Sequence, residues 1–138
     1  MASTTAILIA RLIFAGVFIM AATFKFLGMD ETAGYIAAAG FPVPLILAWL
    51  VAFFEVGLAL AFLTGAVFTP SALLAAVYVL FLGFAFHGPA TWQGNPEGFG
   101  LFVDHFVFIA GLLFAAVHGP GRFAVRIALG RVGVSRFA

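Results

Sequence analysis

Charged and imidazole side chains are scarce in this chain, so each of them is a candidate for chemistry. Only 8% of the 138 residues are charged, whereas 65% are hydrophobic. A charge inside an apolar segment is costly to bury, so such residues usually face a protein interior, are paired, and often mark a function. They form two groups. The ligand-binding candidates are Lys25, His87, Asp104 and His105, and the candidate buried ion pair is Arg11 with Glu55.

The ligand-binding candidates are compatible with three interpretations. A lysine or histidine can donate a hydrogen bond to a quinone carbonyl, while a carboxylate–histidine pair handles the proton. Imidazole and carboxylate groups are also metal-ligand types, but adjacent positions 104 and 105 point in different directions on a helix, and no HExxH-type spacing is present. No metal site is therefore assigned. The third interpretation is a hydrogen-bonded rim without a ligand. We expect Asp104 to face the helix bundle and His105 to lie at its edge.

The second group consists of one cation and one carboxylate in neighbouring apolar segments. Glu55 lies near the middle of the segment 45–65, and Arg11 lies near the start of the first apolar segment. If these segments form an antiparallel helix pair, the two side chains fall at similar depths. The sequence therefore predicts a buried Arg11–Glu55 ion pair, which would act as a structural link or as a gate.

The elements that position these residues are long apolar segments. The mean hydropathy is +1.25, and four segments, 6–28, 45–65, 70–86 and 99–117, approach or reach the length needed to cross a bilayer. This pattern predicts an all-α integral membrane protein, a four-transmembrane-helix bundle that forms a single domain over residues 1–138. The lipid bilayer is its expected partner. Because the net charge is only +1, nucleic acid is not an expected partner.

Basic residues are concentrated in the C-terminal tail, residues 119–138. Four of the six cations lie there, Arg122, Arg126, Arg131 and Arg136. By the positive-inside rule this end is cytoplasmic, and four spans place both termini in the cytoplasm. We expect the tail to form a short basic amphipathic segment on the inner leaflet. Small residues on the apolar segments also permit a homo-oligomer.

Several sequence features over about residues 7–123 occur in an order and spacing similar to those of a known family. They are Ala10-Arg11, Lys25, the Gly40-x-Pro42-x-Pro44 turn, Glu55, Gly65 with Thr69, His87, and Gly119-Pro120-Gly121. The chain resembles the DoxX-like small inner-membrane proteins. The resemblance implies a four-helix bundle in a bacterial-type inner (plasma) membrane, with both termini inside. It also implies a connection with sulfur or thiol oxidation, because the name-giving members are associated with thiosulfate:quinone oxidoreductase.

One departure from the family pattern bears on the candidate site. Many relatives have a Lys-Asn pair at the start of the fourth span, where this chain has Asp104-His105. The substitution reverses the sign of a charge and makes Asp104 a potential partner for Lys25.

The expected function is that of a membrane subunit which interacts with a quinone or another small ligand in a redox system. The chain has no cysteine, which excludes thiol chemistry and cysteine-ligated clusters, so a redox partner protein is expected to carry the electron chemistry. No residue is assigned as catalytic, and enzymatic activity is left open. The alternative is a non-enzymatic membrane scaffold or small-solute carrier stabilised by the buried Arg11–Glu55 pair.

Overall fold

The computed structural model describes residues 2–125, which form helices joined by short connections. Two short helices, α2 (Met29–Ala38) and the 3-10 turn η1 (Pro89–Thr91), accompany four long ones. The long helices are apolar enough to cross a membrane: α1 (Ala2–Leu27), α3 (Pro44–Thr64), α4 (Phe68–His87) and α5 (Pro96–His118). The predicted all-α membrane fold is therefore confirmed, and the predicted spans match the long helices to within a few residues.

Local sequence signals set several helix ends. Pro44 begins α3, where its missing N–H costs nothing, and Gly65 ends it with a φ of 74°, a conformation that disfavours side chains with a Cβ. The side chain of Asn95 caps α5 by accepting a hydrogen bond from the Gly98 N–H at 3.1 Å, and Pro96 occupies the first helical position. These signals separate the spans with short connections.

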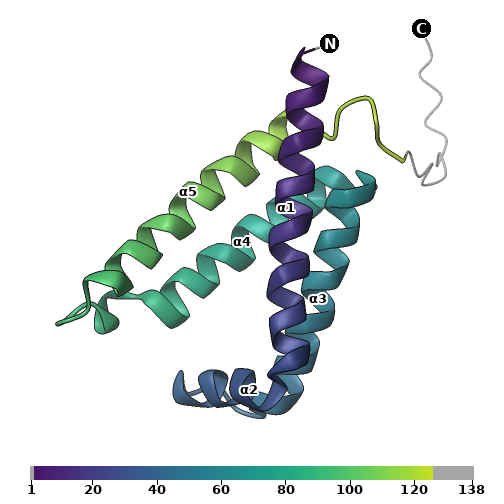
Figure 1. Ribbon diagram of the computed structural model, residues 1–138. Coiled ribbons are helices and arrows are strands. Elements are labelled where there is room, and N and C mark those ends of the chain that lie inside the picture. The colour runs from purple at the N-terminus through teal and green to yellow at the C-terminus, as the bar shows by residue number, and fades with distance from the viewer. Residues whose placement is uncertain (1, 126–138) are drawn as a thin grey trace, which may run out of the picture.

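The long helices form two pairs, α1 with α3 and α4 with α5 (Figure 1). Small residues are buried where the first pair meets, including Ala15 and Ala22 on α1 and Ala48 and Ala52 on α3. Such residues let helix backbones approach closely in lipid, where dispersion contacts replace the hydrophobic effect as the driving force.

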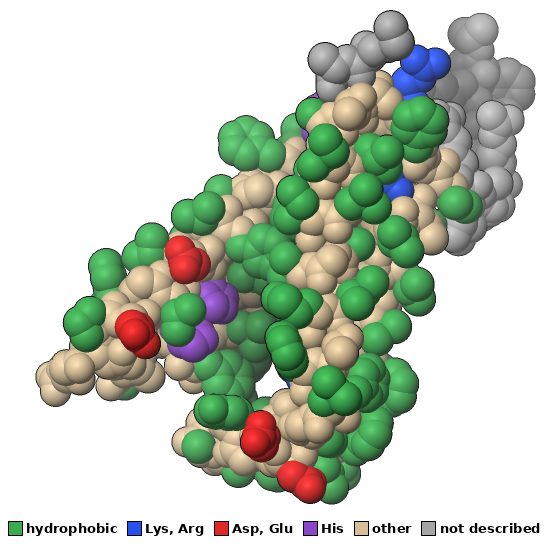
Figure 2. All heavy atoms as spheres, viewed as in Figure 1, with side chains coloured by type: hydrophobic (Ala, Val, Ile, Leu, Met, Phe, Trp, Pro, Cys, Tyr) green, Lys and Arg blue, Asp and Glu red, His purple; other side chains and the backbone are tan. Residues whose placement is uncertain are grey.

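The two pairs meet at one end of the molecule and diverge toward the other, where α2 crosses below α1 and α3 (Figure 1). Phenylalanine rings fill the space near the meeting point. The Phe14 ring lies 5.2 Å from that of Phe62 on α3 and 5.4 Å from that of Phe108 on α5, centroid to centroid. These rings therefore pack the two pairs together at this end. Elsewhere the helices expose large apolar side chains (Figure 2), as expected for surfaces that contact lipid.

Arg11 connects both pairs at the meeting point, and we call its surroundings the junction: Arg11, the last turn of α3 and residues 119–125. The Arg11 side chain is only 2% exposed. Its Nε donates to the Phe62 carbonyl at 3.0 Å and its Nη2 to the Leu63 carbonyl at 2.8 Å. Its Nη1 donates to the carbonyls of Pro120, at 3.0 Å, and Phe123. One side chain thus satisfies carbonyls at the end of α3, which lack partners within the helix, and holds the segment that follows α5.

The predicted amphipathic tail is described only in its first part. Residues 119–125 are irregular and pack against the end of α3, where the Val125 N–H donates to the Thr64 carbonyl at 2.9 Å. Residues 126–138, including Arg126, Arg131 and Arg136, lie outside the described residues. Residue 125 and the start of α1 lie at the same end of the molecule (Figure 1).

Replacing Arg11 with methionine is expected to destabilise the protein strongly. The variant leaves buried carbonyls at the junction without donors, at a cost on the order of 3 kcal/mol. Thermal unfolding of the detergent-solubilised protein, followed by circular dichroism, would measure the loss. Arg122→Gln is the matched control because Arg122 is exposed. Equal melting temperatures for Arg11→Met and the control would contradict this assignment.

Candidate ligand-binding site

Glu55, the carboxylate in the middle of α3, is paired with Lys25 and Tyr78. Its side chain is almost completely buried. The Lys25 Nζ lies 2.9 Å from Glu55 Oε1, and the Tyr78 hydroxyl donates to the same oxygen at 2.6 Å. Glu55 Oε2 is buried without a hydrogen-bond partner. We call these three residues the Glu55 network. It links α1, α3 and α4.

The predicted Arg11–Glu55 ion pair is wrong. Arg11 contacts the carbonyls of Phe62 and Leu63, which follow Glu55 by seven and eight positions on α3. At a rise of about 1.5 Å per residue, this register separates Arg11 from Glu55 by roughly two helical turns. Lys25 is the cation that reaches Glu55, and this is the only salt bridge among the described residues. Both predicted residues are buried, but with different partners.

A cavity of about 570 Å³ lies beside the Glu55 network, where the helix pairs diverge. It is predominantly apolar. Its walls come from the end of α1, from α2, and from facing parts of α3 and α4, and include Phe24, Ile36, Leu47, Phe81 and Phe86.

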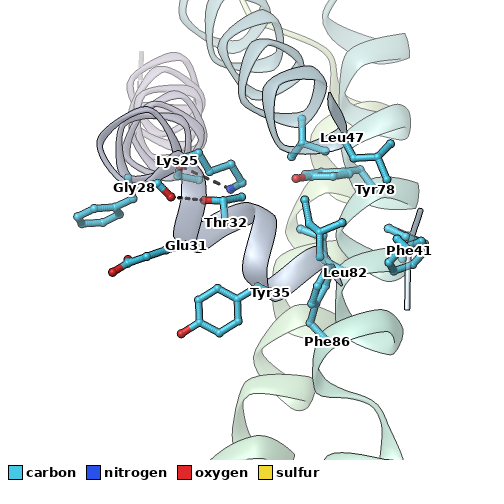
Figure 3. A pocket seen from close by; sticks show the side chains of 15 residues that line it. Lys25, Gly28, Glu31, Thr32, Tyr35, Phe41, Leu47, Tyr78, Leu82 and Phe86 are labelled. Carbon is cyan, nitrogen blue, oxygen red and sulfur yellow. Dashed lines mark hydrogen bonds between the residues drawn. The ribbon is translucent and has the colours of Figure 1, made fainter. Parts of the chain in front are cut away.

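Two polar groups of the network line this cavity. Figure 3 shows the Lys25 ammonium and the Tyr78 hydroxyl pointing toward one another, whereas the hydroxyl of Tyr35, which also lines the cavity, points away from both. Lys25 also approaches the Ala21 carbonyl, at 3.5 Å. An ammonium group has three N–H donors, so Lys25 retains one for a ligand. The Tyr78 oxygen retains acceptor capacity.

The remaining predicted site residues lie elsewhere. The rings of His87 and His105 are neighbours, with centroids 5.2 Å apart, and His105 Nδ1 lies 2.6 Å from the Leu101 carbonyl. Neither histidine nor Asp104 is among the residues that line the cavity. Of the four predicted ligand-binding residues, only Lys25 does so. Among the described residues, no group of three or more His, Cys, Asp or Glu side chains is placed to hold a metal ion.

The predicted orientation of the Asp104-His105 pair is reversed. Asp104 is exposed, and His105 is the half-buried residue that faces α4. Gly83 on α4 explains this arrangement, because the position where its missing Cβ would lie is 3.3 Å from the His105 Cβ. The glycine leaves room for the imidazole, so α5 turns position 105 and not 104 toward its partner helix.

Sequence reasoning missed Tyr78. The signal was a polar-tipped aromatic residue in the middle of the segment 70–86, since a buried tyrosine hydroxyl usually has a hydrogen-bond partner. Glu55, which the sequence analysis assigned only as a partner of Arg11, also belongs beside the candidate site.

Comparisons with known proteins agree with this architecture. A family search matches residues 6–88 to DoxX. The chain is 32% identical over 123 residues to inner membrane protein YphA of Escherichia coli strain K12, which covers 86% of each chain. It is 31% identical over 119 residues to inner membrane protein YqjF of the same organism, covering 86% of this chain and 88% of the relative. The search of solved structures gives no significant match. Because it has these relatives and four apolar helices long enough to cross a membrane, the chain belongs to the DoxX family and is a multi-pass inner-membrane protein.

Proposed function

We propose that this protein is a quinone-interacting membrane component of a redox system, and that the quinone headgroup binds in the cavity beside the Glu55 network. The observation that carries the proposal is a largely apolar cavity of about 570 Å³ with Lys25 and Tyr78 on its wall. Small-molecule sites are typically apolar clefts with a few placed polar groups. A quinone has the matching chemistry, because a flat apolar ring bears polar oxygens and carries an apolar chain.

The charges favour a neutral ligand over an anion. The Lys25 ammonium is already compensated by the Glu55 carboxylate at 2.9 Å, so the network adds no net charge to the cavity. Lys25 can still donate a hydrogen bond to a carbonyl oxygen, and the Tyr78 oxygen can accept one from a hydroxyl. This donor and acceptor suit the oxidised and reduced forms of a quinone, respectively.

A bound quinone supplies electron and proton transfer that the side chains of this chain do not provide alone. The sequence contains no cysteine, and a redox partner protein, in a sulfur- or thiol-oxidising system, would exchange electrons with the ligand. The arginine-rich C-terminal end faces the cytoplasm in this proposal, because basic residues favour that side. The protein's part is to bind and orient the headgroup within the bilayer.

Removing the two polar groups is expected to weaken quinone binding. Lys25→Met and Tyr78→Phe each delete a hydrogen-bonding group on the cavity wall, and the loss should be about tenfold for the charged donor. Equilibrium dialysis of a short-chain ubiquinone analogue against the detergent-solubilised protein would measure it. Tyr35→Phe is the matched control, since the Tyr35 hydroxyl points away from Lys25 and Tyr78 (Figure 3). Unchanged affinity for the analogue in both variants, or no saturable binding of it to the wild type, would contradict the proposal.

A second pair of variants tests the placement of the ligand. His87→Ala and Asp104→Asn alter side chains outside the cavity, so they should leave the affinity for the same analogue unchanged. A loss of affinity in these variants, with Lys25→Met unaffected, would move the site to the histidine pair.

The alternative function is a non-enzymatic scaffold, and the Glu55 network favours it over a carrier. The network joins three helices, whereas the α1 residues between Lys25 and Arg11 that face inward are apolar, among them Ala15, Phe18 and Ala22. These residues provide no polar path between the two ends. A scaffold would use the network for stability alone.

Glu55→Gln is expected to lower stability under either function. The variant leaves the Lys25 ammonium without its counter-charge. Breaking a fully buried pair lowers the free energy of unfolding by on the order of 3 to 5 kcal/mol, and the loss is smaller here because Lys25 is partly exposed. The double variant Lys25→Met/Glu55→Leu should recover much of the melting temperature, because it removes both charges. A double variant no more stable than Glu55→Gln would contradict this account. Recovery together with absence of quinone binding to the wild type would favour the scaffold.

A further inference from the structure

A second apolar cavity lies between α1 and α5, close to the junction. It plays no part in the proposed quinone binding. Its volume is about 480 Å³. Small residues on the two helices, Ala6 and Ala10 on α1 and Gly111 and Ala115 on α5, leave room between them, and Phe14 also lines the space. We call this space the α1–α5 slot. Its volume and mostly apolar lining suit a hydrocarbon chain.

The residues at the junction end of the slot are basic. Arg11 and His118 line it, and the exposed Arg122 follows Gly121, whose missing Cβ would lie 3.2 Å from Ile7 on the slot wall. In the part of the chain that the structure describes, Arg11 donates only to neutral backbone carbonyls, and no carboxylate forms a salt bridge with it.

Acidic residues are separated from this end. Figure 2 shows the Asp and Glu side chains in the middle and toward the opposite end of the molecule from the arginines at the junction. Apart from Glu55, the acids of the chain belong to α2 and to the first half of α5, namely Asp30, Glu31, Glu97 and Asp104. The charge of the described residues at the junction end is thus positive.

We propose that the α1–α5 slot is a binding site for an anionic phospholipid, with one acyl chain between α1 and α5 and the phosphate near His118 and Arg122. An apolar slot next to positive charge matches both parts of such a lipid. Basic residues close to a membrane surface attract anionic headgroups by about 1 kcal/mol each. The proposed site is distinct from the quinone cavity, which the α1, α2, α3 and α4 helices line.

The test is native mass spectrometry of the full-length protein after equilibration with phosphatidylglycerol or phosphatidylcholine of identical acyl chains. The wild type should retain phosphatidylglycerol in preference. Gly111→Leu fills the slot, where an added Cβ would meet Phe14 at an ordinary 3.4 Å, and should abolish the preferential retention. Gly57→Leu is the matched control, because a Cβ there meets no other residue within 4 Å.

A charge variant tests the proposal without altering the slot. Arg122→Gln should lower the preference for phosphatidylglycerol about fivefold, the equivalent of about 1 kcal/mol, and Arg122→Lys should preserve it. Equal retention of the two lipids by the wild type would overturn the proposal, as would full retention by both Gly111→Leu and Arg122→Gln. A wild-type dimer that Gly111→Leu dissociates, with lipid retention unchanged, would instead assign the slot to a second copy of the chain.

Discussion

The arrangement of the two helix pairs depends on the hydrogen bonds of one buried guanidinium. Arg11 donates to the end of α3 and to the segment after α5, so it joins three parts of the chain that are far apart in sequence. A guanidinium has five donors in a rigid planar group, and this geometry lets a single residue serve carbonyls on different segments. Lysine has the same charge, but its compact ammonium does not reproduce that spread of donors.

The divergence of the helix pairs follows from where their contacts lie. Phenylalanine rings and the Arg11 hydrogen bonds hold the pairs together at the junction, while α2 occupies the opposite end of the α1–α3 pair. The Glu55 network bridges α1, α3 and α4 between these ends. It therefore has two physical roles, since it links the pairs and also presents polar groups to the cavity that their divergence creates.

Composition and segment length were sufficient to predict the spans, because the bilayer imposes a narrow range of apolar lengths. Pro44 and Gly65 fixed the ends of α3 for similarly local reasons. The partner of Glu55 was not predictable in this way. It depends on the register between α1 and α3. A shift of about two helical turns between these helices would bring Arg11 to Glu55 in place of Lys25. The orientation of Asp104 and His105 depends on the space left by Gly83 on α4. The periodicity of residues along α5 alone gives no information about that space.

The divergence of the two pairs also gives the molecule a wedge shape (Figure 1). A wedge that spans a bilayer occupies more area in one leaflet than in the other. Membrane curvature that expands the leaflet around the diverging ends should therefore favour the wedge over a parallel bundle. The reason is that the two shapes interact differently with the curved membrane, and only such a difference can shift the balance between them. A change in the lateral stress of the membrane is therefore expected to change the width of the cavity between α3 and α4.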